Sequence, residues 1–598
     1  MKLPSRVALI GSAVVATATV LAFVSSLNDA PIVDEVPHIG AGYSYVAAQD
    51  MRLNPEHPPL IKDLAGLALL PVLGFNNPAF STTNWTTDVN GQWQFGRSVI
   101  FGSGVSPDTI KMVARAPMLL VFILACWLVW RWARERYGDT TALIAIILFA
   151  FSPTILAHGR FVTTDMGAAT GVLVATYYFI AFLRAPKRRA FVLAALTLGL
   201  ALLAKFNTVL LGPYFVAVAL LYGLDGTWRS WRAWKKALRL VWLTVLVGVT
   251  AFVGVVWPWY ILHTLHYPAA RQHSNTQAIL NGYPDSLLKT LVVWASDKPV
   301  IRGAGQWTLG LAMVQQRSVG GNTIYYMGRV VTAGGPGYFP TVYFLKEPLA
   351  WWILFSMALT ALAFHHRRRP KEHKRGHFFT DNFEEWAWLL WLLIYWTISM
   401  RSTLNIGVRH LLPIYPFTIL LVSGRIGVLI EWLRVHDRAR LQWFSLAIAG
   451  LLGWYTFESV RVWPSYLSYF NQLAGGPSGG HRFVADSNLD WGQDIKRLGQ
   501  WMDANSIQHV SLDYFGWSDP VYYLGQKYIY TTGSYWKDAK DFIKRNPSDG
   551  WIAISATFYQ EATNRAEPGR STYRWLMDYE PIAVIGNSIF VWHVSASR

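Results

Sequence analysis

The sequence has 598 residues, of which 53% are hydrophobic and only 15% are charged, and it contains 30 tryptophans. This composition is typical of a protein with several membrane spans and argues against a soluble enzyme of this length. The formal net charge of +18 does not indicate a nucleic-acid partner, because the Lys and Arg residues lie in short groups between apolar segments instead of on one basic face.

Long apolar runs recur along the chain. A bilayer core of about 30 Å needs roughly 20 apolar residues per helix, and this length predicts a polytopic α-helical membrane protein with about eleven spans. The predicted spans start near residues 7, 112, 141, 165, 189, 207, 238, 342, 385, 411 and 441. The first run is long for the apolar part of a signal peptide and lacks a convincing cleavage site, so we expect an uncleaved anchor.

The basic groups predict the orientation of these spans. They occupy residues 131–136, 184–189, 228–239, 365–375 and 434–440, and each follows an even-numbered span. The positive-inside rule then places the N-terminus in the cytoplasm and all five groups with it. The loops at 28–111 and 264–341, and everything after about residue 463, are expected outside. We therefore predict a multi-pass protein of the cytoplasmic (inner) membrane.

The first outer loop begins with a dense set of ionisable residues. The 29 positions from 34 to 62, at the membrane surface, include Asp34, Glu35, His38, Glu56, His57 and Lys62. Ionisable groups are expensive to desolvate there, so they have either a function or partners that satisfy them. Residue types alone leave both readings open. The loop continues with NPEHPPLIKDLAGLALLPVL, which predicts an interfacial helix with Pro58 and Pro59 in its first turn.

Further charged residues stand at the outer ends of later spans. Asp165 begins the fourth span and is either a second acid of the site or a carboxylate that stabilises the helix N-terminus. Lys205 ends the fifth span, where it either meets a lipid phosphate or extends to the interface. Arg409 precedes His410 in a short outer turn, and its planar guanidinium suits a phosphate.

Several histidines are also candidates. His158 and Arg160 in the second outer turn either reach an anionic ligand or extend to the interface. His263, His266 and His273 are spaced like metal ligands, but no carboxylate or cysteine accompanies them, so we favour an interfacial role. A divalent metal is left open as a cofactor.

The chain changes character near residue 464. The remaining segment is polar and mixed, and it alternates predicted strands near residues 509–515, 528–533, 551–559 and 581–594 with helices near 489–505 and 535–546. This pattern predicts a membrane module over residues 1–463 and a small extracytoplasmic α/β domain over 464–598. In the acid-rich stretch from Asp486 to Asp494, the spacing is not that of a calcium loop, and helix capping with domain docking is favoured.

These motifs, taken together in order, resemble the GT-C class of membrane glycosyltransferases that use polyprenyl-phosphate sugars, in particular bacterial relatives of protein O-mannosyltransferases and aminoarabinose transferases. The residues that carry the resemblance are Asp34-Glu35, EHPPL at 56–60, Thr164-Asp165, NIGVRHLLPIYP from 405 and DSNLDWGQDIKRL from 486. The resemblance extends over essentially the whole chain.

The resemblance implies a role for each candidate. Asp34 would be the general base toward the acceptor, with Glu35 and Asp165 in support. Relatives have an acid followed by lysine before the two prolines, whereas this chain has Glu56 and His57. Because of that departure, Lys62, Lys205 or Arg409 is preferred as the cation that holds the donor phosphate. The predicted donor-binding set is Glu56, His57, Lys62, Lys205, Arg409 and His410.

The expected partners are a polyprenyl-phosphate sugar, membrane lipids and an extracytoplasmic protein, lipid or glycan acceptor. Direct inversion at the sugar needs one base. Two other classes stay open. A transporter or flippase of lipid-linked sugars would favour symmetric halves or broken helices, which the hydropathy does not suggest. A noncatalytic scaffold would not require acids at two separate outer helix ends.

Overall fold

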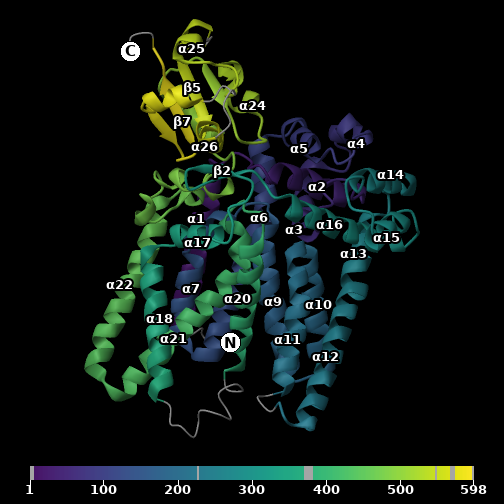
Figure 1. The fold of residues 1–598 in the computed structure, drawn as a ribbon, viewed down its shortest axis with the longest axis vertical. Helices are drawn as coiled ribbons and strands as arrows, with labels where there is room; N and C mark the ends of the chain where they lie inside the picture. Colours follow the sequence, from purple (N-terminus) through teal and green to yellow (C-terminus); the bar gives the residue numbers. More distant parts are fainter. Residues whose placement is uncertain (1–5, 225–227, 369–381, 546–547, 566–572, 596–598) are drawn as a thin grey trace.

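The structure, a computed structural model, describes residues 6–224, 228–368, 382–545, 548–565 and 573–595. Figure 1 shows a bundle of long helices, with a layer of shorter helices and a β-sheet both at one end. Residues 369–375 of the fourth predicted basic group lie outside the described residues.

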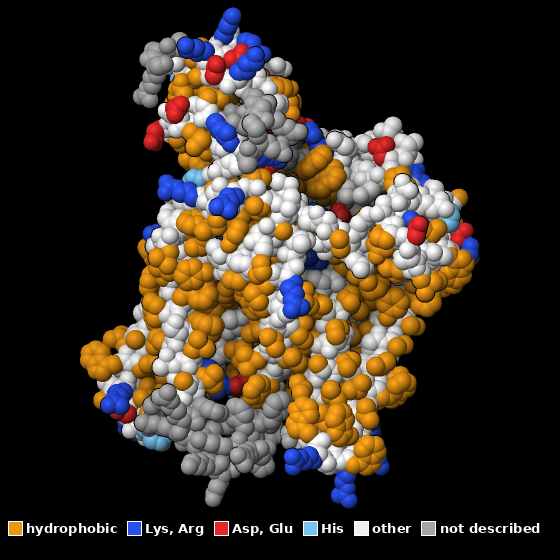
Figure 2. Space-filling view, viewed as in Figure 1, with side chains coloured by type: hydrophobic (Ala, Val, Ile, Leu, Met, Phe, Trp, Pro, Cys, Tyr) orange, Lys and Arg blue, Asp and Glu red, His pale blue; other side chains and the backbone are white. Residues whose placement is uncertain are grey.

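The bundle contains a helix at each of the eleven predicted spans. These helices are α1 (Arg6–Ser26), α6 (Pro107–Tyr137), α7 (Asp139–Ala150), α9 (Thr164–Arg184), α10 (Arg188–Ala204), α11 (Leu211–Leu224), α12 (Trp231–Ala251), α17 (Tyr338–Lys346) with α18 (Leu349–Arg368), α20 (Phe383–Arg401), α21 (Tyr415–His436) and α22 (Arg438–Val462). A helix pairs its backbone N–H and C=O groups with each other, which is required in lipid because the hydrocarbon offers no hydrogen-bonding partner. Figure 2 shows hydrophobic side chains spread over the visible face of the bundle. Among the exposed apolar residues of these helices are Leu120 and Leu393, which are 67% and 65% exposed.

Only some of these helices have the length and composition of a membrane span. Among the described residues, six helices are long and apolar enough to cross a membrane, and the pair α17 and α18, bent by 109°, would be a seventh. Helices α7, α10, α20 and α22 lie at four other predicted spans but do not meet the same requirement of length and composition. The total of eleven spans therefore stays a prediction.

The two long outer loops form the layer of shorter helices. It contains α2 (Glu35–Ala48), α3 (Leu60–Leu73), α4 (Thr83–Thr86), α5 (Gln92–Phe101), α14 (Ala269–Ile279), α15 (Leu287–Ala295), α16 (Ile301–Gly320) and a hairpin of β1 (Ile324–Tyr326) and β2 (Arg329–Val331). Helix α13 (Trp257–His263) instead continues the span of α12. The interfacial helix predicted after Pro58 and Pro59 is α3, which begins one residue later at Leu60. Gly42 and Gly66 let α2 and α3 touch, because a Cβ at either residue would collide with backbone atoms of the other helix.

The C-terminal region contains a five-stranded sheet in the order β4-β3-β5-β7-β6. Strand β3 pairs in parallel with β4 and β5, whereas β7 pairs antiparallel with β5 and β6. The elements are α23 (Ile495–Ala504), β3 (Val510–Asp513), α24 (Pro520–Leu524), β4 (Tyr528–Tyr530), α25 (Ala539–Arg545), β5 (Trp551–Ser555), α26 (Ala556–Asn564), β6 (Ala583–Ile585) and β7 (Ile589–His593). Helices α23 and α25 and strands β3, β4 and β5 lie where they were predicted. The prediction was wrong for residues 556–559, which begin α26 and do not extend β5, it missed α24, and the one strand predicted over 581–594 is the two strands β6 and β7. The domain boundary at 464 stays a prediction.

A short backbone pairing joins this region to the start of the first outer loop. The amide of Ala30 donates to the carbonyl of Gln493, and the amide of Val33 donates to that of Trp491, both at 2.9 Å. Arg497 of α23 adds an ion pair with Asp29 at 2.6 Å. The residue that follows Val33 is Asp34, so the acid-rich C-terminal stretch fixes the position of the predicted general base.

Candidate functional site

A cavity of about 200 Å³ lies at the end of the bundle that carries the layer of short helices. Six of the nine predicted site residues line it: Asp34, Glu56, His57, Lys205, Arg409 and His410. Asp165 lies directly behind two of them, whereas Glu35 and Lys62 lie elsewhere. Residues up to 376 positions apart in the sequence therefore meet at one place.

Two carboxylates and two cations form the centre of this site. Arg409 Nη1 contacts Asp34 Oδ2 at 2.6 Å and Asp165 Oδ2 at 3.4 Å, and Lys205 Nζ forms an ion pair with Asp165 Oδ1. The Asp165 side chain is 1% exposed and that of Arg409 is 8% exposed, but that of Asp34 is 21% exposed. Of these two carboxylates, Asp34 is therefore the one that a ligand in the cavity can reach.

The charge state of Asp34 follows from its surroundings. Burial alone would raise the pKa of this carboxyl, but the guanidinium of Arg409 and its hydrogen bond outweigh that effect and hold the pKa below its ordinary value. Asp34 is consequently an ionised carboxylate at neutral pH, as a general base must be.

Helix ends explain why these charges gather here. Asp34 immediately precedes α2 and Asp165 lies in the first turn of α9, where the N-terminal end of the helix dipole favours negative charge. Lys205 immediately follows α10, where the C-terminal end favours a cation. The two interpretations of Asp165 from the sequence are therefore compatible. Its carboxylate lies at the N-terminal end of α9, and it also pairs with Lys205 and Arg409.

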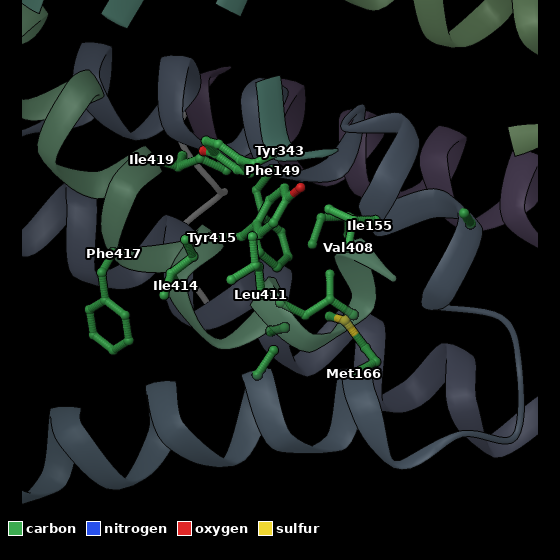
Figure 3. Close-up of a cluster of buried hydrophobic side chains, with 14 of the residues drawn as sticks. Phe149, Ile155, Met166, Tyr343, Val408, Leu411, Ile414, Tyr415, Phe417 and Ile419 are labelled. Atoms are coloured by element: carbon green, nitrogen blue, oxygen red, sulfur yellow. The ribbon is translucent and has the colours of Figure 1, made fainter. Parts of the chain in front are cut away.

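Arg409 lies in η5 (Val408–Ile414), a short 3-10 helix packed on the bundle core. Figure 3 shows Val408 and Leu411 of η5 among Met166, Phe149 and other buried apolar side chains. Because η5 and the start of α9 share this core, Arg409 and Asp165 are held in fixed register.

Trp491 is a site residue that the sequence reasoning missed. Its ring lies 4.3 Å from the guanidinium carbon of Arg409, a cation–π contact that holds the guanidinium plane in place. Nearby, Asn488 Oδ1 accepts a hydrogen bond from the Val408 amide at 3.0 Å. The predicted docking role of the stretch from Asp486 to Asp494 is thus confirmed, and its docking surface is the site itself.

The structure corrects the supporting role predicted for Glu35. Arg115 of α6 binds both carboxylate oxygens, at 2.8 and 2.5 Å, and the amides of Ile32 and Val162 each donate to one at 3.0 Å. The Glu35 side chain is fully buried. Its acceptor sites are occupied within the protein, so Glu35 anchors the loop and is not available to a substrate.

Lys62 is also removed from the predicted phosphate clamp. Its ammonium is fully buried and donates to the Tyr45 hydroxyl, to the carbonyl and side-chain oxygens of Asn54 at 2.9 Å, and to the His57 carbonyl at 2.6 Å. Burial lowers the pKa of Lys62 well below its ordinary value. Lys62 holds the turn that presents Glu56 and His57, and it does not reach the cavity.

The other cavity residues are polar groups on the wall. Glu56 lies 3.6 Å from Arg317 of α16. The His57 ring packs edge-on against His38 at 5.0 Å, and burial lowers the pKa of His57 so that it is neutral. His410 Nε2 is buried and has no hydrogen-bond partner among the described residues. His410 is thus a cavity-lining residue with an unused hydrogen-bonding atom.

The remaining candidates have structural partners. Arg160 forms a buried ion pair with Asp29 at 3.0 Å, so it neither faces a ligand nor extends to the interface. His263 contacts Asp63 at 2.8 Å, whereas His266 and His273 contact a backbone carbonyl and Ser296. Within the described ranges, no group of three metal-binding side chains could hold an ion.

Comparisons with known proteins bear on the family. Residues 108–259 match the family model of dolichyl-phosphate-mannose-protein mannosyltransferases. No curated protein sequence matches the chain. The Pmt1-Pmt2 protein O-mannosyltransferase of S. cerevisiae, solved with its sugar donor, matches with a TM-score of 0.53 at 11% identity, over 84% of this chain and 92% of that one.

Two further solved structures match with lower scores. The oligosaccharyltransferase AglB of Archaeoglobus fulgidus has a TM-score of 0.48 at 12% identity, over 96% of this chain and 75% of that one. ArnT of Cupriavidus metallidurans has a TM-score of 0.30 at 14% identity, over 99% of both chains. The predicted resemblance is thus confirmed, since the chain has the fold of the GT-C membrane glycosyltransferases and residues 108–259 carry the pattern of the protein mannosyltransferase family.

Proposed function

We propose that this chain is an integral-membrane glycosyltransferase that moves a sugar from a polyprenyl-phosphate donor to an extracytoplasmic acceptor, which is a protein, a lipid or a glycan. The observation that carries the proposal is one cavity that contains the partly exposed carboxylate of Asp34 together with Lys205 and Arg409. Transfer from a phosphate donor requires a proton acceptor and cations that stabilise the departing phosphate. The cavity supplies both.

In the proposed reaction, the acceptor hydroxyl oxygen bonds to the anomeric carbon while Asp34 takes the hydroxyl proton. The bond from the anomeric carbon to the phosphate oxygen breaks, and its electron pair leaves with the lipid phosphate, which gains a second negative charge. Direct displacement inverts the anomeric carbon and needs a single base. Asp165 keeps its charge throughout and positions the two cations.

Arg409 links the donor to the base. In the free protein it contacts Asp34 at 2.6 Å. A donor phosphate bound to the same guanidinium competes for this charge, and weakening the contact raises the pKa of Asp34. The carboxylate then becomes a better proton acceptor at the moment the donor is in place, because proton transfer is favoured as the base pKa approaches the operating pH.

The cavity wall also has an apolar part suited to the polyprenyl chain. Leu210 of η2 (Phe206–Leu210) and Ile398 of α20 both line it, and Ile398 is 43% exposed on the apolar surface of the bundle. A donor can therefore enter sideways from the membrane with its phosphate at the cations and its chain in lipid.

The proposal also includes the orientation of the helix bundle in the membrane. Figure 1 places the junctions between α9 and α10, α11 and α12, and α21 and α22 at the end of the bundle opposite the C-terminal sheet. These junctions carry three of the basic groups found in the sequence. With the basic end in the cytoplasm, the cavity and the C-terminal region face outward.

The proposal is tested by removing the protein from its host and measuring lipid-linked sugars and surface glycans by mass spectrometry. We expect one polyprenyl-phosphate sugar to accumulate and one glycan to disappear, and the wild-type chain to restore both. Asp34→Asn should fail to restore them. The matched control is Glu431→Gln, an exposed carboxylate at the basic end of α21. Unchanged lipid-linked sugars on removal would refute the proposal.

A further inference from the structure

A second, larger cleft of about 1270 Å³ lies in the C-terminal region. Asp513 and Tyr530, which end the neighbouring parallel strands β3 and β4, both line it. Arg97 of α5 contributes from the first outer loop. The cleft thus opens at the carboxyl ends of parallel strands, which is where α/β sheets bind their ligands.

Aromatic side chains line part of the cleft. Tyr528, Tyr530 and Phe558 line it, and the Tyr530 side chain is 59% exposed. Large exposed rings beside a hollow indicate a binding surface, because a ligand that covers them removes apolar area from water. The C–H faces of pyranose rings offer a flat apolar surface of matching size.

Two carboxyl groups, those of Asp513 and Glu561, also line the cleft. Asp513 is 8% exposed and accepts a hydrogen bond from the Tyr573 hydroxyl at 2.7 Å. Glu561 lies 3.7 Å from Arg565. Burial raises the pKa of Asp513 to about 6 and that of Glu561 to about 7, although Arg565 opposes the rise at Glu561. Carboxyl groups of this kind pair with vicinal hydroxyls as acceptors and, when protonated, as donors.

Helix α26 connects this cleft to the charged cavity. In its first turn the Thr557 amide donates to Asp490 at 2.9 Å, and the Thr557 hydroxyl accepts from the Asp486 amide at 3.0 Å. The next residue after Asp490 is Trp491, which packs on Arg409. The same helix presents Phe558 and Glu561 to the cleft, so one short element contacts both places.

Asp486 lies between the two sites. Burial raises the pKa of Asp486 to about 6, Arg409 opposes the rise, and the charge of Asp34 adds to it. Asp486 in turn acts on Glu561. Asp486 is therefore electrostatically coupled to Asp34 at the cavity and to Glu561 at the cleft.

The cleft offers little to an extended peptide. Peptides dock on long free strand edges, in apolar helix grooves or on arginine clusters. The free edge here is β4, which has only three residues. The mixture of exposed tyrosines and carboxyls fits a polyhydroxylated ligand better.

We propose that this cleft binds a saccharide chain and presents it to the cavity as the acceptor. The binding of saccharide is independent of catalysis, whereas its role as acceptor rests on the proposed function.

The test uses the purified full-length protein in detergent, without donor. Saturation-transfer NMR is recorded with tetrasaccharides of mannose, glucose and galactose and with a Ser/Thr-rich decapeptide, each at about 5 mM, above the 1 mM scale of a weak site. We expect at least one tetrasaccharide to be saturated. Tyr530→Ala should weaken its binding by up to about tenfold, the value of one aromatic contact. Glu561→Gln should also weaken it.

The matched control is Tyr522→Ala, which removes a 46% exposed tyrosine of α24 that does not line the cleft. It should leave binding unchanged. Saturation of the decapeptide alone, or of no ligand, would overturn the inference, as would equal saccharide binding by Tyr530→Ala and wild type. Because no donor is present, a failure of glycosyl transfer in separate assays would count against the proposed function and not against saccharide binding.

Discussion

Asp34→Asn is the substitution that tests the site most directly. Asparagine keeps the size of the side chain and removes the proton-accepting charge. Loss of a positioned general base slows a reaction about 10²- to 10⁴-fold, which corresponds to roughly 2.7 to 5.4 kcal/mol of activation free energy at 1.36 kcal/mol per tenfold. Transfer should fall by this amount while donor still binds.

The structure predicts a different failure for the neighbouring acid. Asp34 is partly exposed, and Arg409 keeps its second partner, Asp165, at 3.4 Å when Asp34 is neutralised. The free energy of unfolding should therefore change little. In Glu35→Gln, the fully buried Arg115 loses a charged partner. Breaking a buried pair in this way costs about 3 to 5 kcal/mol, so this variant should lose stability before it loses turnover per folded molecule.

The assay measures turnover of a polyprenyl-phosphate sugar by Asp34→Asn, Glu35→Gln and Asp165→Asn at equal amounts of folded protein, with thermal unfolding recorded in parallel. Asp165→Asn should show a smaller kinetic loss than Asp34→Asn, because Asp165 is buried and acts through the cations. Near-normal turnover of Asp34→Asn would show that another carboxylate is the base. Near-normal turnover of all three would argue against an enzyme centred on this cavity.

Three further outcomes follow from the same geometry. Lys205→Ala and Arg409→Ala should each raise the apparent KM for the donor, and an unchanged KM in both would remove the phosphate clamp. Arg409→Gln removes the charge that holds the pKa of Asp34 low, so the acid limb of kcat/KM against pH should move to higher pH; a shift to lower pH would contradict this sign. Alkaline phosphatase fused after Ser597 should be active, whereas activity from only a cytoplasmic reporter there would reverse the topology.

Much of the site could be predicted, because the length of an apolar run determines how deep in the membrane the residues at its ends lie. Asp34, Asp165, Lys205 and Arg409 each stand at the outer end of an apolar run, and outer ends share one level of the bundle whatever their separation in sequence. The strands of the C-terminal sheet were predictable from their β-branched and aromatic alternation. The sharp bend between α17 and α18, by contrast, has no equivalent in hydropathy, which averages over it.

The division of roles among neighbouring charges was not predictable. Asp34 and Glu35 are adjacent acids of similar chemistry, and only the path of α6 decides that Arg115 meets Glu35. The sequence did contain a hint in Arg115. A cation near the start of the second predicted span requires an acidic partner, and Glu35 was available as one. Trp491 offered less, because a tryptophan in a docking segment does not reveal that its ring covers Arg409.

The charge of the cluster connects the resting structure to the proposed reaction. Asp34 and Asp165 balance Lys205 and Arg409, so the buried group is neutral without ligand. A phosphodiester donor adds one negative charge. When the sugar leaves, the phosphate gains a second negative charge and Asp34 loses its own by taking the acceptor proton. The total charge in this poorly solvated site is the same before and after sugar transfer. The reaction only moves one negative charge from Asp34 to the phosphate, both of which contact Arg409 in the proposed complex. Such a transfer avoids the cost of creating new buried charge, which is why one guanidinium shared between the base and the leaving group is a better arrangement than two separate cations.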